Sequence, residues 1–142
     1  MDQLKVDLGI EEFDLGCGVL RFNPADPNLY ARFLDLEPQL ESLQQALSQK
    51  TARATDAAGL IKALAETDRQ LKDLLTQVFG EENDFSKLLR GINLLSTAGN
   101  GLSVAENLLA ALEPVLSQGA ERFVESKMVA AREKARQRRE NL

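Results

Sequence analysis

The sequence contains no histidine, and this absence removes several kinds of active site at once. Histidine is the commonest general base, completes Ser-His-Asp triads and supplies most catalytic zinc sites. An enzyme built from this chain would have to rely on carboxylates or lysine. We therefore expect no catalytic residues and a protein that is not an enzyme.

Two acidic clusters and two glycine pairs are the remaining candidates for chemistry. Neither residues 11–14 nor residues 81–84 have the alternating oxygen ligands and central glycine of a calcium-binding loop. The Gly16-Cys17-Gly18 stretch lacks the third glycine of a dinucleotide fingerprint, and no Lys-Ser/Thr pair follows Gly99-Asn100-Gly101. We interpret the acids as solvated turns or helix caps and the glycines as turn residues, so we expect no metal and no cofactor.

Cysteine is scarce, and long apolar runs are missing. Cys17 is the single cysteine, which excludes an internal disulfide and a multi-cysteine zinc site, and we interpret it as a buried thiol. Acidic residues lie among the first seven, where a secretory signal needs a basic start and an apolar block. The longest apolar run, residues 108–112, is far below the roughly 20 residues that span a bilayer. We expect a soluble cytoplasmic protein without membrane contact.

Aromatic residues make up 5% of the chain and tryptophan is absent, whereas 44% of the residues are hydrophobic. A core of this composition is built mainly from Leu, Val, Ile and Ala, which favours helices. The 142 residues fit one domain with a real core. We therefore expect a single, mainly α domain over residues 1–142.

The net charge of −5 is unevenly distributed along the chain. Residues 1–120 carry 10 Lys and Arg against 18 Asp and Glu, and residues 121–142 carry 7 against 4. The acidic body argues against general nucleic-acid binding, because phosphate contacts need clustered cations. The basic end is either a solvated, fraying helix or a contact for RNA or an acidic partner.

The first third of the chain predicts a β-hairpin followed by a short helix. Over residues 3–22, Leu4, Val6, Leu8 and Ile10 alternate with polar or glycine positions, and a turn lies near residues 16–18. Two strands are only marginally stable alone, so the hairpin must pack on helices or on another chain. Asp26 can cap a helix with Pro27 at its first position, and we expect a short helix over about 27–36 that Pro38 interrupts or kinks.

Residues 38–79 show a heptad-like spacing of apolar side chains. The pattern fits two helices, about 38–50 and 55–79, or one long helix with a soft middle. Both arrangements present an amphipathic seam, which is either core or a groove for a partner. Its strongest members are Leu40, Leu43, Leu47, Ile61, Leu64 and Leu71.

Three further helices are expected after Phe79 and Gly80, which end the seam. They are residues 84–96 with Asp84 as N-cap, a central buried helix capped by Ser103 and bent near Pro114, and a last helix over 120–138 separated by Gln118-Gly119. The sequence thus predicts a helical bundle of about five helices, with a hairpin at 3–22, a helical core at 27–119 and a basic C-terminal helix or tail at 120–142.

Taken in order, these features resemble the tail-assembly chaperones of long-tailed bacteriophages and prophages of Gram-positive bacteria. The resemblance rests on the hairpin that ends in Phe22-Asn23-Pro24-Ala25-Asp26-Pro27-Asn28, the helix with Tyr30 and Phe33, the Val78-Phe79-Gly80-Glu81 junction, the Asn100–Ser103 helix start, the 108–116 helix and the Lys/Arg-rich end. Within it, Phe22, Asp26, Pro27, Phe79 and Gly80 form the structural signature. The chain departs from the family pattern where Gly-Thr would follow the junction glutamate and where a second Phe-Gly would lie near residues 88–91.

The resemblance implies a non-enzymatic protein of the bacterial host cytoplasm that is absent from the mature virion. Such chaperones hold the aggregation-prone tape-measure protein soluble and help recruit tail-tube subunits. We place the contact on the leucines and isoleucine of the 40–71 seam, and a homo-oligomer is compatible with this role. The competing interpretation is a prophage-encoded helical regulatory or scaffold dimer that contacts protein or nucleic acid through its basic tail.

Overall fold

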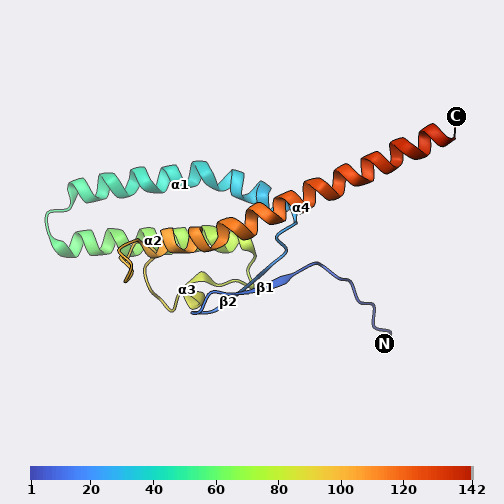
Figure 1. Cartoon of the computed structure of the whole chain (residues 1–142). Helices are drawn as coiled ribbons and strands as arrows, with labels where there is room; N and C mark the ends of the chain where they lie inside the picture. The colour runs from blue at the N-terminus through green and yellow to red at the C-terminus, as the bar shows by residue number, and fades with distance from the viewer. Residues whose placement is uncertain (142) are drawn as a thin grey trace.

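The computed structural model describes residues 1–141, which are mainly helical with one short N-terminal β-hairpin (Figure 1). This confirms the predicted class, but the described chain contains four helices instead of about five. None of them is both long and apolar enough to cross a bilayer. In order, the elements are β1 (Glu11–Asp14), β2 (Val19–Phe22), α1 (Pro27–Arg53), α2 (Ala57–Phe79), α3 (Phe85–Leu88) and α4 (Val104–Glu140).

The hairpin is shorter than the predicted span of residues 3–22. Strands β1 and β2 pair antiparallel, with Glu11 opposite Phe22, and a turn containing Gly16 at φ +83° joins them. Residues 1–10 have no partner strand, because β2 ends at Phe22 and the chain turns into α1, so they are irregular and exposed. Cys17, in the turn, is half-buried, not the fully buried thiol that we predicted.

Helix α1 starts as predicted but does not stop before Pro38. The Asp26 carboxylate accepts a hydrogen bond from the Asn28 N–H at 2.9 Å, and Pro27 occupies the first helical position. The helix continues through Pro38 to Arg53. An internal proline costs one hydrogen bond and about 3 kcal/mol. Packing of α1 along α2 offsets this cost. The expectation that proline ends a helix considers only neighbouring residues and cannot include this packing.

Helices α1 and α2 form an antiparallel helical hairpin (Figure 1). The break at residues 54–56 favours the two-helix prediction over one continuous helix. The two ends that flank the break differ from those predicted by two or three residues, and the first helix begins at Pro27 because it includes the short helix predicted over residues 27–36. Asp56 caps α2 by accepting from the Gly59 N–H at 2.8 Å. At the other end Gly80 has φ +109°, a backbone conformation that favours glycine, and its N–H donates to the Thr76 carbonyl.

The predicted helix over residues 84–96 ends after a single turn, α3. Asp84 caps it as expected, accepting from the Ser86 N–H at 3.0 Å. Arg90 and Gly91 then both adopt positive φ, 54° and 74°, which a right-handed helix cannot contain. The prediction failed beyond residue 88 because apolar spacing alone does not reveal this reversal.

A buried ion pair holds the chain that follows α3. The Lys72 ammonium donates to the Asp68 carboxylate at 2.8 Å and to the Ile92 carbonyl at 2.7 Å. The same carboxylate accepts from the Leu94 N–H at 2.7 Å. The backbone groups of Ile92 and Leu94 thus form hydrogen bonds with side chains of α2. These bonds replace the helical hydrogen bonds that the sequence pattern predicted.

Helix α4 is one element from Val104 to Glu140, and the predicted break at Gln118-Gly119 is wrong. Ser103 caps it through the Glu106 N–H at 3.1 Å, as predicted. Gly119 lies inside the helix and packs on the backbone of Pro24. A β-carbon at this position would overlap the Pro24 carbonyl, so the position requires glycine. The glycine therefore allows close approach between α4 and the loop before α1, and the end of α4 projects past the body (Figure 1).

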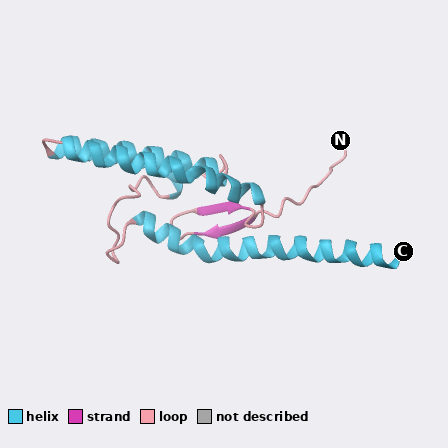
Figure 2. Ribbon diagram, turned by 90° about the horizontal axis from the view of Figure 1, so that it is seen from above, coloured by secondary structure: helices cyan, strands magenta, loops and turns pink. Residues whose placement is uncertain are grey.

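The core lies where the hairpin meets the helices. Seen from above, the two strands lie between the α1–α2 hairpin and α4 (Figure 2). Phe22 of β2 stacks edge-on against Phe79 of α2 with ring centroids 5.0 Å apart, and Phe13, Phe33 and Phe85 extend the same cluster. Five of the six phenylalanines thus join the hairpin to three helices.

The buried Asn83 fixes the hairpin to the end of α2. Its side-chain amide accepts from the Arg21 N–H at 2.9 Å and donates to the Arg21 carbonyl at 2.7 Å, as a neighbouring strand would. It also donates to the Phe79 carbonyl at 3.0 Å. Residues 81–84, which we interpreted as a solvated turn or a helix cap, therefore also contribute a structural junction through Asn83.

Candidate partner-binding groove

An apolar groove of about 280 Å³ lies between the α1–α2 hairpin and the first half of α4. Leucine dominates its walls, and Glu37 is the one charged residue that lines it within the described chain. The lining residues are Phe33, Leu36, Glu37, Leu40, Leu71, Leu74, Leu75, Phe79, Leu94, Ala105, Leu108, Leu109, Leu112 and Leu116.

Helical periodicity explains why these side chains converge. On α4, residues 105, 108, 109, 112 and 116 recur at three- and four-residue steps and form one face. Residues 71, 74, 75 and 79 of α2 do the same on the facing helix. Each helix contributes one apolar stripe, and the groove forms where the stripes diverge.

The groove has a buried floor and an exposed rim. Leu36, Leu94 and Leu112 are buried at its base. Leu109 on α4 is 58% exposed and Leu40 on α1 is 39% exposed, although both are fully apolar. These rim residues lose contact with water only when another chain covers them.

Two polar contacts hold the walls in place. The Lys72–Asp68 pair anchors Leu94 on one side. On the other side, the Tyr30 hydroxyl lies 2.6 Å from the carbonyl oxygens of both Pro24 and Leu116, and joins α1 to α4. Burial raises the pKa of the Tyr30 hydroxyl despite the nearby Arg122 charge, so it stays a neutral donor.

The structure separates the six predicted partner residues into two groups. Leu40 and Leu71 line the groove. Leu43, Leu47 and Leu64 are half-buried outside it, on the distal part of the α1–α2 hairpin, and Ile61 is 64% exposed near the start of α2. The contribution of α4 was missed because its leucines were assigned to a central buried helix. The sequence did contain a signal for this role. The apolar residues of this helix cover most of its circumference, whereas packing against one core needs only one apolar face.

The seam of residues 38–79 is not sealed inside this one chain. Its buried side chains are Ala63, Thr67, Asp68, Lys72, Val78 and Phe79, while every leucine of the segment is half-buried or exposed. Two of the buried side chains, Asp68 and Lys72, bind residues 92–94. This arrangement leaves apolar surface available to a partner.

The structural signature lies in the framework around the groove. Phe22 and Phe79 belong to the aromatic cluster, and Phe79 also lines the groove. Asp26 and Pro27 begin α1, and Gly80 ends α2. These residues set where the two wall helices begin and end.

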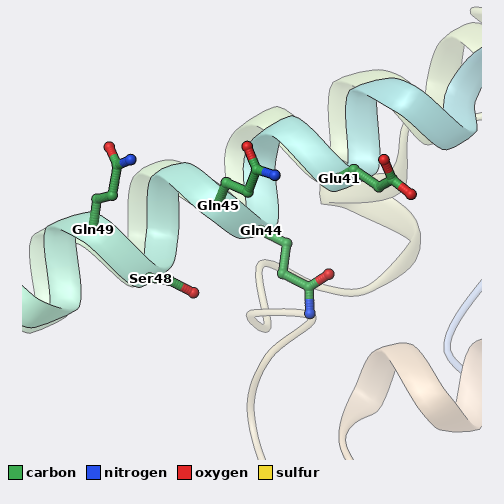
Figure 3. Close-up of a pocket in the computed structure, with 5 residues that line it drawn as sticks. All are labelled: Glu41, Gln44, Gln45, Ser48 and Gln49. Carbon is green, nitrogen blue, oxygen red and sulfur yellow. The ribbon is translucent and has the colours of Figure 1, made fainter.

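The polar surfaces offer no comparable site. Within residues 1–141, no three His, Cys, Asp or Glu side chains gather as metal ligands would. The acids of the hairpin form surface ion pairs, Glu11 with Arg122 and Glu12 with Arg21. Figure 3 shows a shallow hollow on the outer face of α1, lined by Glu41, Gln44, Gln45, Ser48 and Gln49, all of which are exposed.

Comparison with known proteins adds no relative, because no family model, no curated protein and no solved structure matches this chain significantly.

Proposed function

We propose that this protein is a non-enzymatic chaperone that holds an apolar helix of another chain in the groove between α1, α2 and α4. The observation that carries the proposal is the apolar groove with its exposed leucine rim. The partially exposed leucines of the 38–79 seam outside the groove add further apolar side chains along the hairpin.

The groove chemistry favours a helical occupant over an extended one. Its walls provide almost no hydrogen-bond donors or acceptors, so an extended peptide would bury unpaired backbone groups at a cost of several kcal/mol. A helix satisfies its own backbone and presents apolar side chains at positions i, i+3, i+4 and i+7. The expected ligand is therefore an amphipathic helix.

The resemblance to phage tail-assembly chaperones supplies the identity that we propose for this helix, which is a segment of the tape-measure protein. A long helical protein with exposed apolar seams would aggregate unless another chain covered them. The acidic charge of residues 1–120 would keep the complex soluble. In this proposal the protein acts in the bacterial host cytoplasm, helps recruit tail-tube subunits, and is absent from the virion.

Co-expression of this chain with tape-measure fragments tests the proposal. Leu109→Glu and Leu40→Glu place a charge on the groove rim at positions that are already exposed, so both variants should fold. We expect each to reduce the soluble fraction of the fragment severalfold, because a buried unpaired carboxylate opposes apolar contact. Ile61→Glu is the matched control, since Ile61 is equally apolar and exposed but lies outside the groove.

The proposal is wrong if both rim variants solubilise the fragment as well as the unmodified chain does while their circular dichroism is unchanged. Equal losses in the rim variants and in Ile61→Glu would show that the contact is not confined to the groove. Salt-sensitive retention on nucleic acid that depends on residues 132–142 would instead favour the regulatory dimer.

A further inference from the structure

The projecting part of α4 carries an apolar stripe that nothing in the described chain covers. From Val124 to Glu140 every residue is exposed, including Val124 at 53% and Met128 at 49%. With Ala131 and Ala135 these residues follow steps of four, three and four, which is the spacing of a coiled-coil seam. An isolated helix end of this length is marginal in water, so a partner would stabilise it.

Charges change sign along one flank of this stripe. Glu121 and Glu125 precede the midpoint, and Arg132 and Arg139 follow it, on the same side of the helix. Within residues 1–141, neither Glu121, Glu125 nor Arg132 takes part in an ion pair. The flank is therefore complementary to itself when a second helix runs in the opposite direction.

We propose that a second copy of this chain covers the stripe, with the two α4 ends antiparallel about a twofold axis near Met128. In this register Met128 packs on Ala131 of the second copy, and Glu125 of each copy faces Arg132 of the other. Small alanines allow close approach of the helices. On the other flank this register places Lys127 opposite Lys134 of the second copy, and the two Glu125–Arg132 contacts offset that repulsion. A parallel pair would instead place Arg132 beside Lys127 of the second copy, with no attractive contact to compensate.

The charge distribution of the whole chain favours the same arrangement. Residues 1–120 carry excess acid and the end of α4 carries excess base. Antiparallel pairing brings the basic end of each copy to a hollow of the other that Glu121 and Glu125 line, together with the Glu11–Arg122 ion pair. The stripe spans only about 17 Å of helix between its first and last seam residue, since each residue rises about 1.5 Å, so the dimer dissociates on dilution.

Analytical ultracentrifugation of the full chain at low salt, over a wide concentration range, tests the pairing. We expect Met128→Asp to raise the dimer dissociation constant at least about tenfold, because it places two charges in the apolar seam. Ala130→Asp is the matched control, since Ala130 is exposed on the opposite face of the same helix and adds the same charge. It should leave the dissociation constant within about twofold.

A charge exchange tests the direction. Arg132→Glu should weaken an antiparallel dimer, because it faces Glu125 of the second copy, and adding Glu125→Arg should restore it. A parallel dimer predicts the opposite for Arg132→Glu, which would then attract Lys127 of the second copy. Raising the salt concentration should weaken the wild-type dimer through screening.

A chain that stays monomeric at every concentration overturns the proposal. A dimer that Arg132→Glu strengthens, or that Met128→Asp and Ala130→Asp affect equally, also overturns it. The groove variants Leu109→Glu and Leu40→Glu lie on the other half of the molecule and should not change self-association. The failure of this proposal is therefore distinguishable from failure of the proposed function.

Discussion

At the scale of single residues, Lys72 has the largest electrostatic consequence. Its ammonium is buried, and it is held by the Asp68 carboxylate and the Ile92 carbonyl. Lys72→Met would leave the Asp68 charge buried with the Leu94 N–H as its remaining partner. We expect a loss of about 3 to 5 kcal/mol in the free energy of unfolding, measured by urea denaturation.

The matched control is Lys50→Met. Lys50 also forms an ion pair, with Glu66 at 3.0 Å, but both side chains are about half exposed. Solvent screens such a pair, so the same substitution should change stability by less than about 1 kcal/mol. Similar losses for the two variants would show that the Lys72 contact contributes no more than a surface pair.

Gly119 is the position where we expect a larger side chain to affect stability through a steric clash. Gly119→Ala would direct a methyl group at the Pro24 carbonyl, and the backbone there must move to accommodate it. We expect destabilisation by about 1 to 3 kcal/mol, even though alanine in a helix is worth about 1 kcal/mol over glycine. Thermal denaturation measures the balance of these two effects.

Gly99→Ala gives the contrasting case. No atom lies within 4 Å of the position that its β-carbon would occupy, so the substitution should be neutral or slightly stabilising. If Gly119→Ala also proves neutral, α4 does not pack on the Pro24 loop as closely as the structure indicates.

At the scale of elements, the sequence predicted how most helices begin and misjudged where several of them end. Side-chain caps such as Asp26, Asp84 and Ser103 act on the next few residues, so local spacing identifies them. Pro38 was interpreted as an interruption or a kink and Gly119 as a break, yet each lies inside a continuous helix. Packing against another element decides these positions, and spacing along the chain does not contain that information.

The groove was predictable only in part for the same reason. Leu40 and Leu71 belong to a heptad-like seam that sequence periodicity detects. The contribution of Leu109 depends on how α4 lies across the helical hairpin. That placement follows from the Pro24–Gly119 approach and the Tyr30–Leu116 contact, which join residues about 90 positions apart.

At the scale of the whole molecule, the chain divides into a packed body and a projecting helix. The aromatic cluster and the Asn83 junction tie the hairpin, α2 and α3 together. Beyond Phe123, α4 has no buried residue within the described chain. Stability is therefore unevenly distributed, and local opening should differ sharply between the two parts.

Hydrogen exchange measured at two protein concentrations makes this difference observable. In dilute solution we expect the amides of residues 124–140 to exchange almost as fast as those of a free peptide, because short unsupported helices fray. The amides near Phe79 and Phe85 should be the best protected, since these residues are buried in the core. At high concentration, protection should increase over residues 124–140 alone, because pairing of two α4 ends stabilises that segment. Strong, concentration-independent protection there would mean that the helix end is stable without a partner, and the reason to expect self-association would disappear.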